Sequence, residues 1–236
     1  MPEFSMIIPC YRDEERLSSL LEQLCNLSNN EHEIIVVDGA ASKICRNLCR
    51  TFQVRWLPSQ PCRGQQLKEG ASAAKGNVLW FLHADVRLSL HSFSAITQAV
   101  ENGASGGYFK FRFDSPRNWQ ADILEPIIAL RCRIGVPYGD QGLFFLRECY
   151  HTVGGHAPWP LFEEVPLVRK ARRYGKFIAL NKPIFVNSRR WQQEGWWQRT
   201  WRNRVLALQF LCGASPQRLA TRYSNKTPNQ QSRIEY

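Results

Sequence analysis

Apolar and polar positions alternate in two different ways along the first half of the chain. Short runs that are apolar throughout are typical of strands buried on both faces. They stand between longer stretches in which apolar residues recur every three or four positions, as in helices. The predicted strands are residues 4–9, 33–38, 54–57 and 78–83, and the predicted helices are residues 14–27, 43–52, 64–75 and 92–102. This order predicts an α/β fold with a mostly parallel twisted sheet and helices on both of its faces.

The second half of the chain has a less regular pattern. No change in composition marks a domain boundary, so we expect a single domain over residues 1–223. Residues 224–236 are polar with few apolar positions, and we expect a disordered tail there. Strands are predicted over residues 106–112, 142–146, 177–180 and 184–186, the last two separated by Pro183, and helices over residues 123–133, 165–174 and 196–212.

The C-terminal helix predicted over residues 196–212 is amphipathic and basic. Three arginines lie near its start, and its apolar stripe consists of Trp197, Trp201, Val205, Leu208 and Cys212. A basic, Trp-rich helix of this kind can lie in a membrane interface, whereas the same stripe would also suit packing against a protein core. No apolar run approaches the roughly 20 residues that are needed to span a bilayer.

Charge and cysteine content narrow the class of protein. The formal net charge is +11, which suits an anionic partner: nucleic acid, a phosphate-bearing substrate or an anionic membrane. The eight cysteines form no Cys-x-x-Cys pair, and most lie inside apolar runs. The N-terminus has neither the basic start nor the long apolar stretch of a signal peptide. We therefore expect reduced thiols and a cytoplasmic protein.

Three of the predicted strands end in residues that suit a binding site. Tyr11 and Glu14 follow the first strand, Asp38 closes the second, and His83 and Asp85 follow the fourth. In open α/β sheets, ligands bind beyond the carboxyl ends of the strands. Taken singly, Asp38 and Asp85 would also suit caps of helices or turns. Their position at one edge of the same sheet favours a site.

The motifs that are missing also guide the interpretation. Neither Gly-x-Gly-x-x-Gly nor Gly-x-x-x-x-Gly-Lys-Ser/Thr occurs, which disfavours a Rossmann dehydrogenase and a P-loop enzyme. A nucleotide would need another grip, and a carboxylate such as Asp38 can accept a hydrogen bond from a base or a ribose. Asp85 can hold Mg²⁺ or Mn²⁺, which share oxygen ligands with substrate phosphates. Such a metal offsets the charge of a departing diphosphate.

Three segments resemble motifs of the family-2 glycosyltransferases, which have the GT-A fold. They are IIPCYRDEERL at residues 7–17, IIVVDGAAS at residues 34–42 and RGQQLKEGASAAKGNVLWFLHAD at residues 63–85. The resemblance covers about residues 4–223. The most similar subgroup consists of small bacterial enzymes whose metal motif ends in His-x-Asp; some are linked to arsenosugar-type pathways, and related enzymes glycosylate carotenoid acids. The sequence departs from the family at Asp13, usually Asn, and at His83, usually Asp.

The resemblance implies roles for residues of the first half. Residues 1–105 would bind the nucleotide-sugar, and Asp85 would hold Mg²⁺ or Mn²⁺. The implied donor-binding residues are Pro9, Tyr11, Glu14, Asp38, Gly39, Arg63, His83 and Ala84.

The resemblance also implies an acceptor and catalytic half over residues 106–223. Glu163 and Glu164 match an acidic pair whose second member is the catalytic base, which assigns that role to Glu164. Without the resemblance, both acids would suit the start of a helix, where the dipole favours negative charge. The segments at residues 139–142 and 187–191 resemble acceptor and Gln-x-x-Arg-Trp motifs. Residues implied to contact the acceptor or the diphosphate are Asp140, Gln141, Arg190 and Trp191.

Together these features predict a metal-dependent, inverting glycosyltransferase. It would transfer a sugar from a nucleotide-sugar to a hydroxyl or carboxyl group of a small or lipid-like acceptor. We expect a cytoplasmic protein with no nucleic-acid partner, and peripheral contact of residues 196–212 with the inner face of the cell membrane stays open. The alternatives are a nucleotidyltransferase on a related scaffold and a basic nucleic-acid-binding protein.

Overall fold

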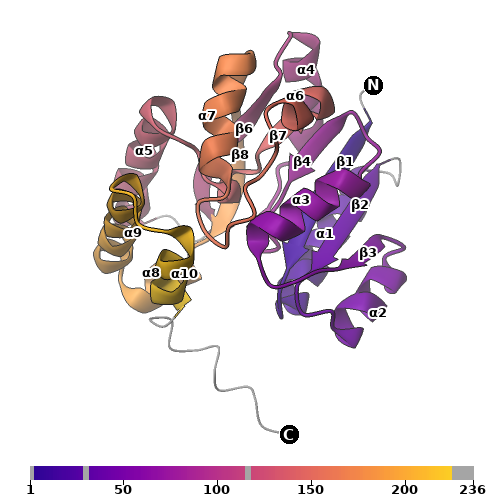
Figure 1. The fold of residues 1–236 in the computed structure, drawn as a ribbon, viewed down its shortest axis with the longest axis horizontal. Helices are drawn as coiled ribbons and strands as arrows, with labels where there is room; N and C mark the ends of the chain where they lie inside the picture. The colour runs from indigo at the N-terminus through magenta and orange to yellow at the C-terminus, as the bar shows by residue number, and fades with distance from the viewer. Residues whose placement is uncertain (1–2, 29–31, 115–117, 225–236) are drawn as a thin grey trace, which may run out of the picture.

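The computed structural model describes residues 3–28, 32–114 and 118–224. Within these residues one sheet has the strand order β3-β2-β1-β4-β7-β6-β8-β5 (Figure 1). The strands are β1 (Phe4–Cys10), β2 (Glu33–Asp38), β3 (Arg55–Pro58), β4 (Val78–Phe81), β5 (Val86–Arg87), β6 (Gly106–Asp114), β7 (Phe144–Leu146) and β8 (Phe177–Asn187).

Helices cover both faces of the sheet. One face packs against α1, α2 and α4, and the other packs against α3, α6 and α7. The helices are α1 (Glu14–Ser28), α2 (Lys43–Thr51), α3 (Arg63–Ala73), α4 (Ser92–Glu101), α5 (Trp119–Ile134), α6 (Arg147–Thr152), α7 (Glu164–Tyr174), α8 (Arg189–Glu194), α9 (Trp196–Leu211) and α10 (Pro216–Ser224), with a 3₁₀ turn η1 at Gly139–Gln141. The predicted α/β fold is thereby confirmed.

The pairing of the strands sets the position of the site. Strands β3, β2, β1 and β4 are parallel, and their register places Cys10 beside Asp38 at the carboxyl ends of β1 and β2. Strand β7 is antiparallel to both β4 and β6, which joins the second half of the chain to the same sheet. Residues after β1, β2 and β4 therefore share one edge.

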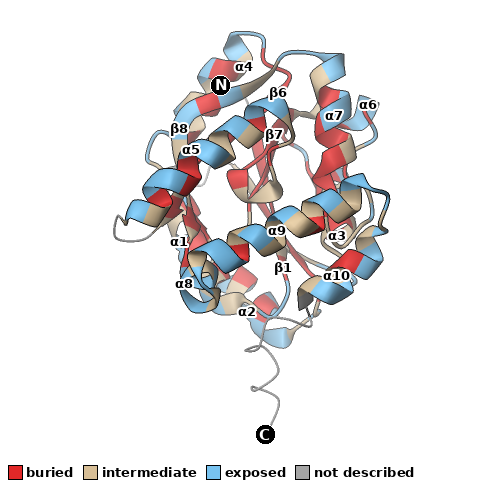
Figure 2. Cartoon of the chain, turned by 90° about the vertical axis from the view of Figure 1, so that its left-hand side faces the viewer, coloured by how far each residue is buried: buried red, intermediate tan, exposed pale blue. Residues whose placement is uncertain are grey.

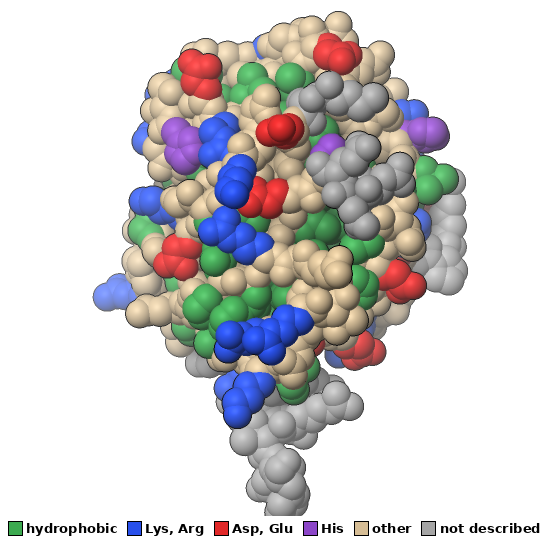
Figure 3. Space-filling view, turned by 90° about the vertical axis from the view of Figure 1, so that its right-hand side faces the viewer, with side chains coloured by type: hydrophobic (Ala, Val, Ile, Leu, Met, Phe, Trp, Pro, Cys, Tyr) green, Lys and Arg blue, Asp and Glu red, His purple; other side chains and the backbone are tan. Residues whose placement is uncertain are grey.

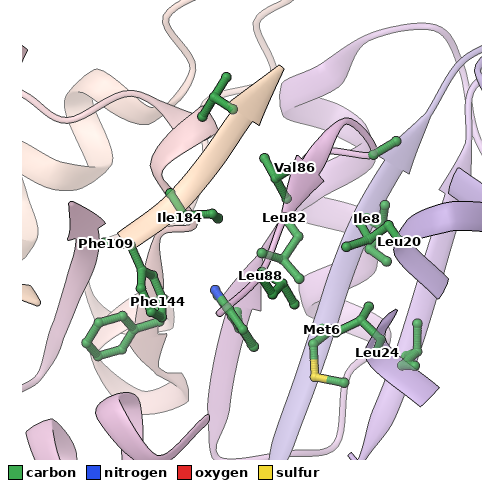
Figure 4. Packing of buried hydrophobic residues seen from close by; sticks show 14 of the residues in the cluster. Met6, Ile8, Leu20, Leu24, Leu82, Val86, Leu88, Phe109, Phe144 and Ile184 are labelled. Atoms are coloured by element: carbon green, nitrogen blue, oxygen red, sulfur yellow. The ribbon is translucent and has the colours of Figure 1, made fainter. Parts of the chain in front are cut away.

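The core explains why these segments form these elements. Met6 and Ile8 of β1 point toward Leu20 and Leu24 of α1 (Figure 4), as expected for side chains two apart on a strand and four apart on a helix. On the opposite face, Gly70 lets α3 approach β1 closely, because a Cβ there would lie 2.4 Å from Ile7 Cγ2.

Strand β8 corrects one prediction. Two short strands broken at Pro183 were predicted, but one strand runs through this proline. Strand β5 pairs only with Phe185 and Val186, so Pro183 lies where the outer edge of β8 has no partner among the described residues. Proline, which lacks an N–H, is tolerated at such an edge. Strand β5 and helices α6, α8 and α10 were not predicted from the sequence.

The tail and the C-terminal helix also differ from expectation. Ser224 is the last residue of α10, and the rest of the predicted tail lies outside the described residues. Helix α9 does not bury its predicted apolar stripe: Trp201 is 68% exposed, and Trp197 and Leu208 are exposed too. Arg199 and Leu206 are buried instead. Across the described residues, no helix is long and apolar enough to cross a membrane.

Gln66 fastens the edge of the sheet where the candidate site lies. Its side chain is buried, and its amide nitrogen donates to the carbonyl oxygens of Cys10 (2.9 Å) and Val37 (2.7 Å). These carbonyls lie at the ends of β1 and β2. One side chain of α3 therefore ties two strand ends together.

Replacing this amide should loosen the edge without unfolding the sheet. We expect Gln66→Leu to lower the free energy of unfolding by about 1–3 kcal/mol, the cost of leaving buried polar groups unpaired. Urea denaturation measures the change. Gln65→Leu is the matched control, because the Gln65 amide donates to Glu69 on its own helix. Equal losses in the two variants would show that Gln66 is not a clamp.

Candidate active site

A cavity of about 610 Å³ opens at the carboxyl edge of the sheet, between the two halves of the chain. Its polar lining comes from segments far apart in the sequence: the N-terminus of α3, the turn after β4, η1, the start of α7, and α8. The predicted site residues that line it are Arg63, His83, Asp85, Asp140, Glu164, Arg190 and Trp191.

The turn after β4 contributes His83 and Asp85. A side chain at Gly139 would lie 2.8 Å from His83 Nε2, so the glycine lets η1 approach the imidazole. Within the part of the chain that is described, this buried nitrogen has no hydrogen-bond partner. Burial, reinforced by the Arg63 charge, lowers the pKa of His83, which keeps the ring neutral. A neutral imidazole can act as a metal ligand or as a hydrogen-bonding group.

The pair Asp140 and Gln141 is divided between the cavity and the protein interior. Asp140 lines the cavity, and its Oδ1 has no partner among the described residues. Burial raises the pKa of Asp140. Gln141 is buried, its Oε1 accepts from the Cys132 thiol (2.9 Å), and its amide nitrogen donates to the Phe109 carbonyl. Gln141 therefore secures η1 and does not line the cavity, so its contact with an acceptor stays a prediction.

The adjacent acids Glu163 and Glu164 have different surroundings. Glu163 is fully buried and forms a two-pronged ion pair with Arg63, in which Nη2 donates to Oε2 at 3.0 Å and Nε donates to Oε1. Burial alone would raise the pKa of Glu163, but the Arg63 charge and hydrogen bonds lower it below its usual range. Glu163 is therefore a buried carboxylate held by a cation.

Glu164 is the first residue of α7 and faces the cavity. Its Oε2 is buried and has no hydrogen-bond partner within the described residues. Burial and the negative charge of Glu163 raise the pKa of Glu164 to about 8. Near neutral pH a carboxyl group of this kind is mostly protonated, and its ionised fraction, which grows as the pH approaches 8, can accept a proton.

The predicted donor-binding acid Asp38 forms hydrogen bonds within the turn that follows β2. It is 0% exposed, its Oδ1 accepts from the Ala40 amide (2.9 Å), and its Oδ2 accepts from the Ser42 amide (2.8 Å) and from Trp56 Nε1 (3.2 Å). Both oxygens are used within the protein. This geometry matches the turn-capping alternative and not direct contact with a nucleobase.

The remaining donor-side residues surround the same turn and do not line the cavity. Ser42 donates to Glu14 Oε1 (2.7 Å) and also caps α2, so Glu14 links the end of β1 to that helix. Tyr11 is half-exposed just beyond β1. Predicted residues with mainly backbone or packing positions are Pro9, Gly39 and Ala84.

Arg190 and Trp191, on α8, line the same cavity. Arg190 donates to the Tyr223 hydroxyl at 2.9 Å. Trp191 packs edge-on against Phe113 with ring centroids 5.0 Å apart. Its indole ring is therefore held in the cavity wall and is less able to stack on a sugar or a lipid.

Three residues with site roles were missed. Gln66 clamps the strand ends. Asp13 has a pKa raised mainly by burial and also by the Asp85 charge, which ties the β1 motif to the cavity. Arg131 lines the cavity and lies over the Tyr138 ring at 3.9 Å. Asp13 departs from the family pattern, and this departure could have marked it as a site residue. Nothing in the sequence marks Gln66 or Arg131 in this way.

Comparison with known proteins gives a family match for this chain. The model of the family described as glycosyl transferase family 2 matches residues 5–154, more than half of the chain. No curated protein matches the sequence.

Solved structures with the same fold include glycosyltransferases of different organisms. Glucosyl-3-phosphoglycerate synthase from Mycobacterium tuberculosis, in complex with Mn²⁺, UDP and glucosyl-3-phosphoglycerate, has a TM-score of 0.59 at 15% identity, covering 78% of this chain and 72% of that chain. The mannosyltransferase PcManGT from Pyrobaculum calidifontis, in complex with GDP-Man and Mn²⁺, has a TM-score of 0.65 at 14% identity, covering 91% and 66%. TarS from S. aureus has a TM-score of 0.63 at 15% identity, covering 78% and 36%. At these identities the likeness shows the shared GT-A fold.

The raised pKa of Glu164 predicts a pH-dependent stability. Between its ordinary value of 4.5 and about 8, the folded chain keeps a proton that the unfolded chain releases, so the stability falls as pH rises. Glu164→Gln carries no such proton. We expect the variant to gain more than about 1.4 kcal/mol relative to wild type between pH 5.5 and pH 8.5, the equivalent of one pKa unit.

Urea denaturation at the two pH values measures this gain. Glu148→Gln, at an exposed acid of α6, is the control and should show no such trend. A constant difference between Glu164→Gln and wild type across this range would contradict the raised pKa.

Proposed function

Because the chain belongs to glycosyl transferase family 2, we propose that it transfers a sugar from a nucleotide-sugar to a hydroxyl or carboxyl group of a small or lipid-like acceptor, with Mg²⁺ or Mn²⁺ as cofactor. The observation that carries the proposal is the carboxyl oxygen of Glu164 that has no partner among the described residues and lies in the same cavity as Asp85. The Mn²⁺ and the UDP or GDP-Man bound by the structural neighbours support the donor class.

The residues present fit a divalent metal that is shared with a substrate. In residues 3–28, 32–114 and 118–224, no three His, Cys, Asp or Glu side chains lie close enough to hold a metal by themselves. Mg²⁺ and similar ions are commonly held by one or two carboxylates plus substrate phosphates. Asp85 would supply the carboxylate and neutral His83 a second ligand, and we keep the subgroup with the His-x-Asp motif as part of the proposal. When bound, the metal supplies charge compensation for the leaving diphosphate.

The cations of the cavity have a related role. Arg190 and Arg63 both line it, and guanidinium groups bind phosphate oxygens through paired hydrogen bonds. Arg63 is already held by Glu163, so Arg190 is the freer of the two to move toward a diphosphate, exchanging its bond to Tyr223. We assign the diphosphate to this side of the cavity.

Glu164 acts as the base in the proposed reaction. Its carboxylate takes the proton of the acceptor hydroxyl, the acceptor oxygen forms a bond to the anomeric carbon, and the bond from that carbon to the diphosphate oxygen breaks. Attack from the side opposite the leaving group inverts the anomeric centre. Glu163 does not compete for this role, because both of its oxygens are bound to Arg63.

The donor half in this proposal is residues 1–105, and the acceptor half is residues 106–223. For Asp38 we propose an indirect role: it holds the turn of residues 38–42, whose backbone and neighbouring Tyr11 then contact the nucleoside. For Asp85 we keep the metal-binding role that the resemblance implies, and for His83 we keep the donor-binding role.

The rival classes have less support. A nucleic-acid-binding protein would need a basic surface, and on the face opposite α5 and α9 the Lys and Arg side chains are interspersed with Asp and Glu (Figure 3). We include peripheral membrane contact of α9 in the proposal, since Trp197 and Trp201 of this helix are exposed. A nucleotidyltransferase would leave the nucleotide on its product, whereas a glycosyltransferase releases it as a diphosphate.

Asp85 should control metal-dependent donor binding. Asp85→Asn keeps the size of the side chain and removes its charge, so we expect at least about tenfold weaker binding of UDP or GDP in the presence of Mn²⁺, a loss of about 1.4 kcal/mol. Isothermal calorimetry with and without Mn²⁺ measures this. Asp114→Asn, at an acid paired with Arg87, is the control. Unchanged metal dependence in Asp85→Asn would remove this residue from the site.

Glu164 should control turnover. We expect Glu164→Gln to lower kcat by roughly 10²–10⁴-fold, the usual contribution of a general base, with nucleotide affinity nearly unchanged. Glu164→Asp should retain more activity than Glu164→Gln, because a carboxylate is kept. Glu163→Gln should mainly lower stability, because it weakens the Arg63 pair. Release of nucleoside diphosphate measures turnover, and a dead Glu163→Gln beside an active Glu164→Gln would reverse the assignment.

A further inference from the structure

Helix α5 exposes a stripe of large apolar side chains. Positions three or four apart lie on one face of a helix, and such a face is usually buried in a globular protein. Here it is open to solvent in the described structure, and Ile134 is 81% exposed. The exposed residues of this stripe are Trp119, Ile123, Ile127, Leu130 and Ile134.

Helix α9 exposes a second apolar stripe next to the first. Its exposed apolar residues are Trp197, Trp201, Leu208 and Leu211. The rings of Trp119 and Trp197 lie 5.8 Å apart, so the two stripes meet at one end. Both helices lie on the same side of the molecule (Figure 2). An apolar surface this continuous is unusual on a monomeric soluble protein and marks a binding surface.

The cavity that holds Glu164 extends between these two helices. Toward the sheet it is lined by charged groups such as Asp85 and Glu164, and away from the sheet it is lined by aliphatic side chains of α5 and α9. The aliphatic lining consists of Leu124, Ile127, Ile128, Leu130 and Ile134 from α5 and Leu206, Leu208 and Leu211 from α9. One cavity thus has a polar end, where the reaction would occur, and an apolar end. We call the apolar end the α5–α9 groove.

We propose that the acceptor is a long-chain amphiphile taken from a membrane surface, with its alkyl or prenyl chain in the α5–α9 groove and its hydroxyl or carboxyl group at Glu164. This rests on the proposed function, because it names the acceptor of that same site. Each methylene moved from water to an apolar wall lowers the free energy, so the groove favours a chain over a small polar acceptor.

The charged and aromatic residues around the groove indicate that the acceptor comes from a membrane. Arg204, which is exposed on α9, lines the cavity beside the aliphatic residues, and cationic side chains are attracted to anionic lipid headgroups. Trp201 and Trp197 stand on the exposed side of α9, and tryptophan prefers the boundary between water and lipid. The groove therefore opens on a surface suited to a bilayer.

Binding of a fluorescent long-chain fatty acid, cis-parinaric acid, tests the chain site. We expect saturable fluorescence enhancement with wild type and at least about tenfold weaker binding to Ile127→Asp and Leu208→Asp, a loss of about 1.4 kcal/mol. Leu90→Asp and Ile44→Asp are the controls, since these residues are also apolar and exposed but do not line the groove. Equal binding by all variants overturns the chain site.

Two further measurements separate the alternatives. Calorimetry with UDP or GDP and Mn²⁺ should be unchanged in Ile127→Asp; a chain that binds while no nucleotide binds would reject the proposed function and leave the groove a lipid site. Sedimentation velocity should show a monomer. If wild type is instead a dimer that binds no probe, and Ile127→Asp dissociates this dimer, a second copy of the chain covers the stripes and the proposal is overturned.

Flotation with phosphatidylglycerol-containing vesicles tests the membrane source. We expect wild type to float at low salt, Trp201→Asp to float at least about tenfold less and Leu90→Asp to float normally. Basic side chains are attracted to the anionic surface, and the tryptophan anchors the helix in it. Probe binding by a protein that never floats would overturn the membrane as the source of the acceptor.

Discussion

The ion pair between Arg63 and Glu163 is the interaction on which the site depends. It joins the first residue of α3, in the first half of the chain, to the residue that precedes α7 in the second half. A fully buried carboxylate is costly unless it is paired and hydrogen-bonded, and here Arg63 reaches both oxygens. The pair fixes where α7 begins. Glu164, as the first residue of that helix, is therefore directed into the cavity.

The same pair also sets the proton affinities around it. The Glu163 charge adds to burial in raising the pKa of Glu164, and the Arg63 charge adds to burial in lowering the pKa of His83. A protonatable carboxyl group and a neutral imidazole thus face one cavity. Two adjacent acids that look equivalent in the sequence become a structural anion and a candidate base, because only one of them meets a cation along both of its oxygens.

The sequence predicted the elements with strong patterns and the positions of the strand-end residues, because both follow from local periodicity. It did not predict which way polar side chains point. Asp38 turns inward because the Ala40 and Ser42 amides and Trp56 converge on it, and Gln141 turns inward because Cys132 and Phe109 are near. These partners come from tertiary packing. The two-residue strand β5 and short helix α8 are too brief to carry a periodic signal.

Helix α9 buries Arg199 and exposes Trp197 and Trp201 because Arg199 holds the helix in place. Arg199 is buried against Glu194, at 2.8 Å, and against the Tyr223 hydroxyl of α10, so the inner side of the helix is fixed by a charged group. Trp197 and Trp201, two positions away on either side of Arg199, lie about 200° around the helix axis from it and must face outward. A helix held by its hydrophobic stripe would close the cavity. Held by Arg199, it leaves that stripe exposed beside α5 and keeps the apolar end of the cavity open.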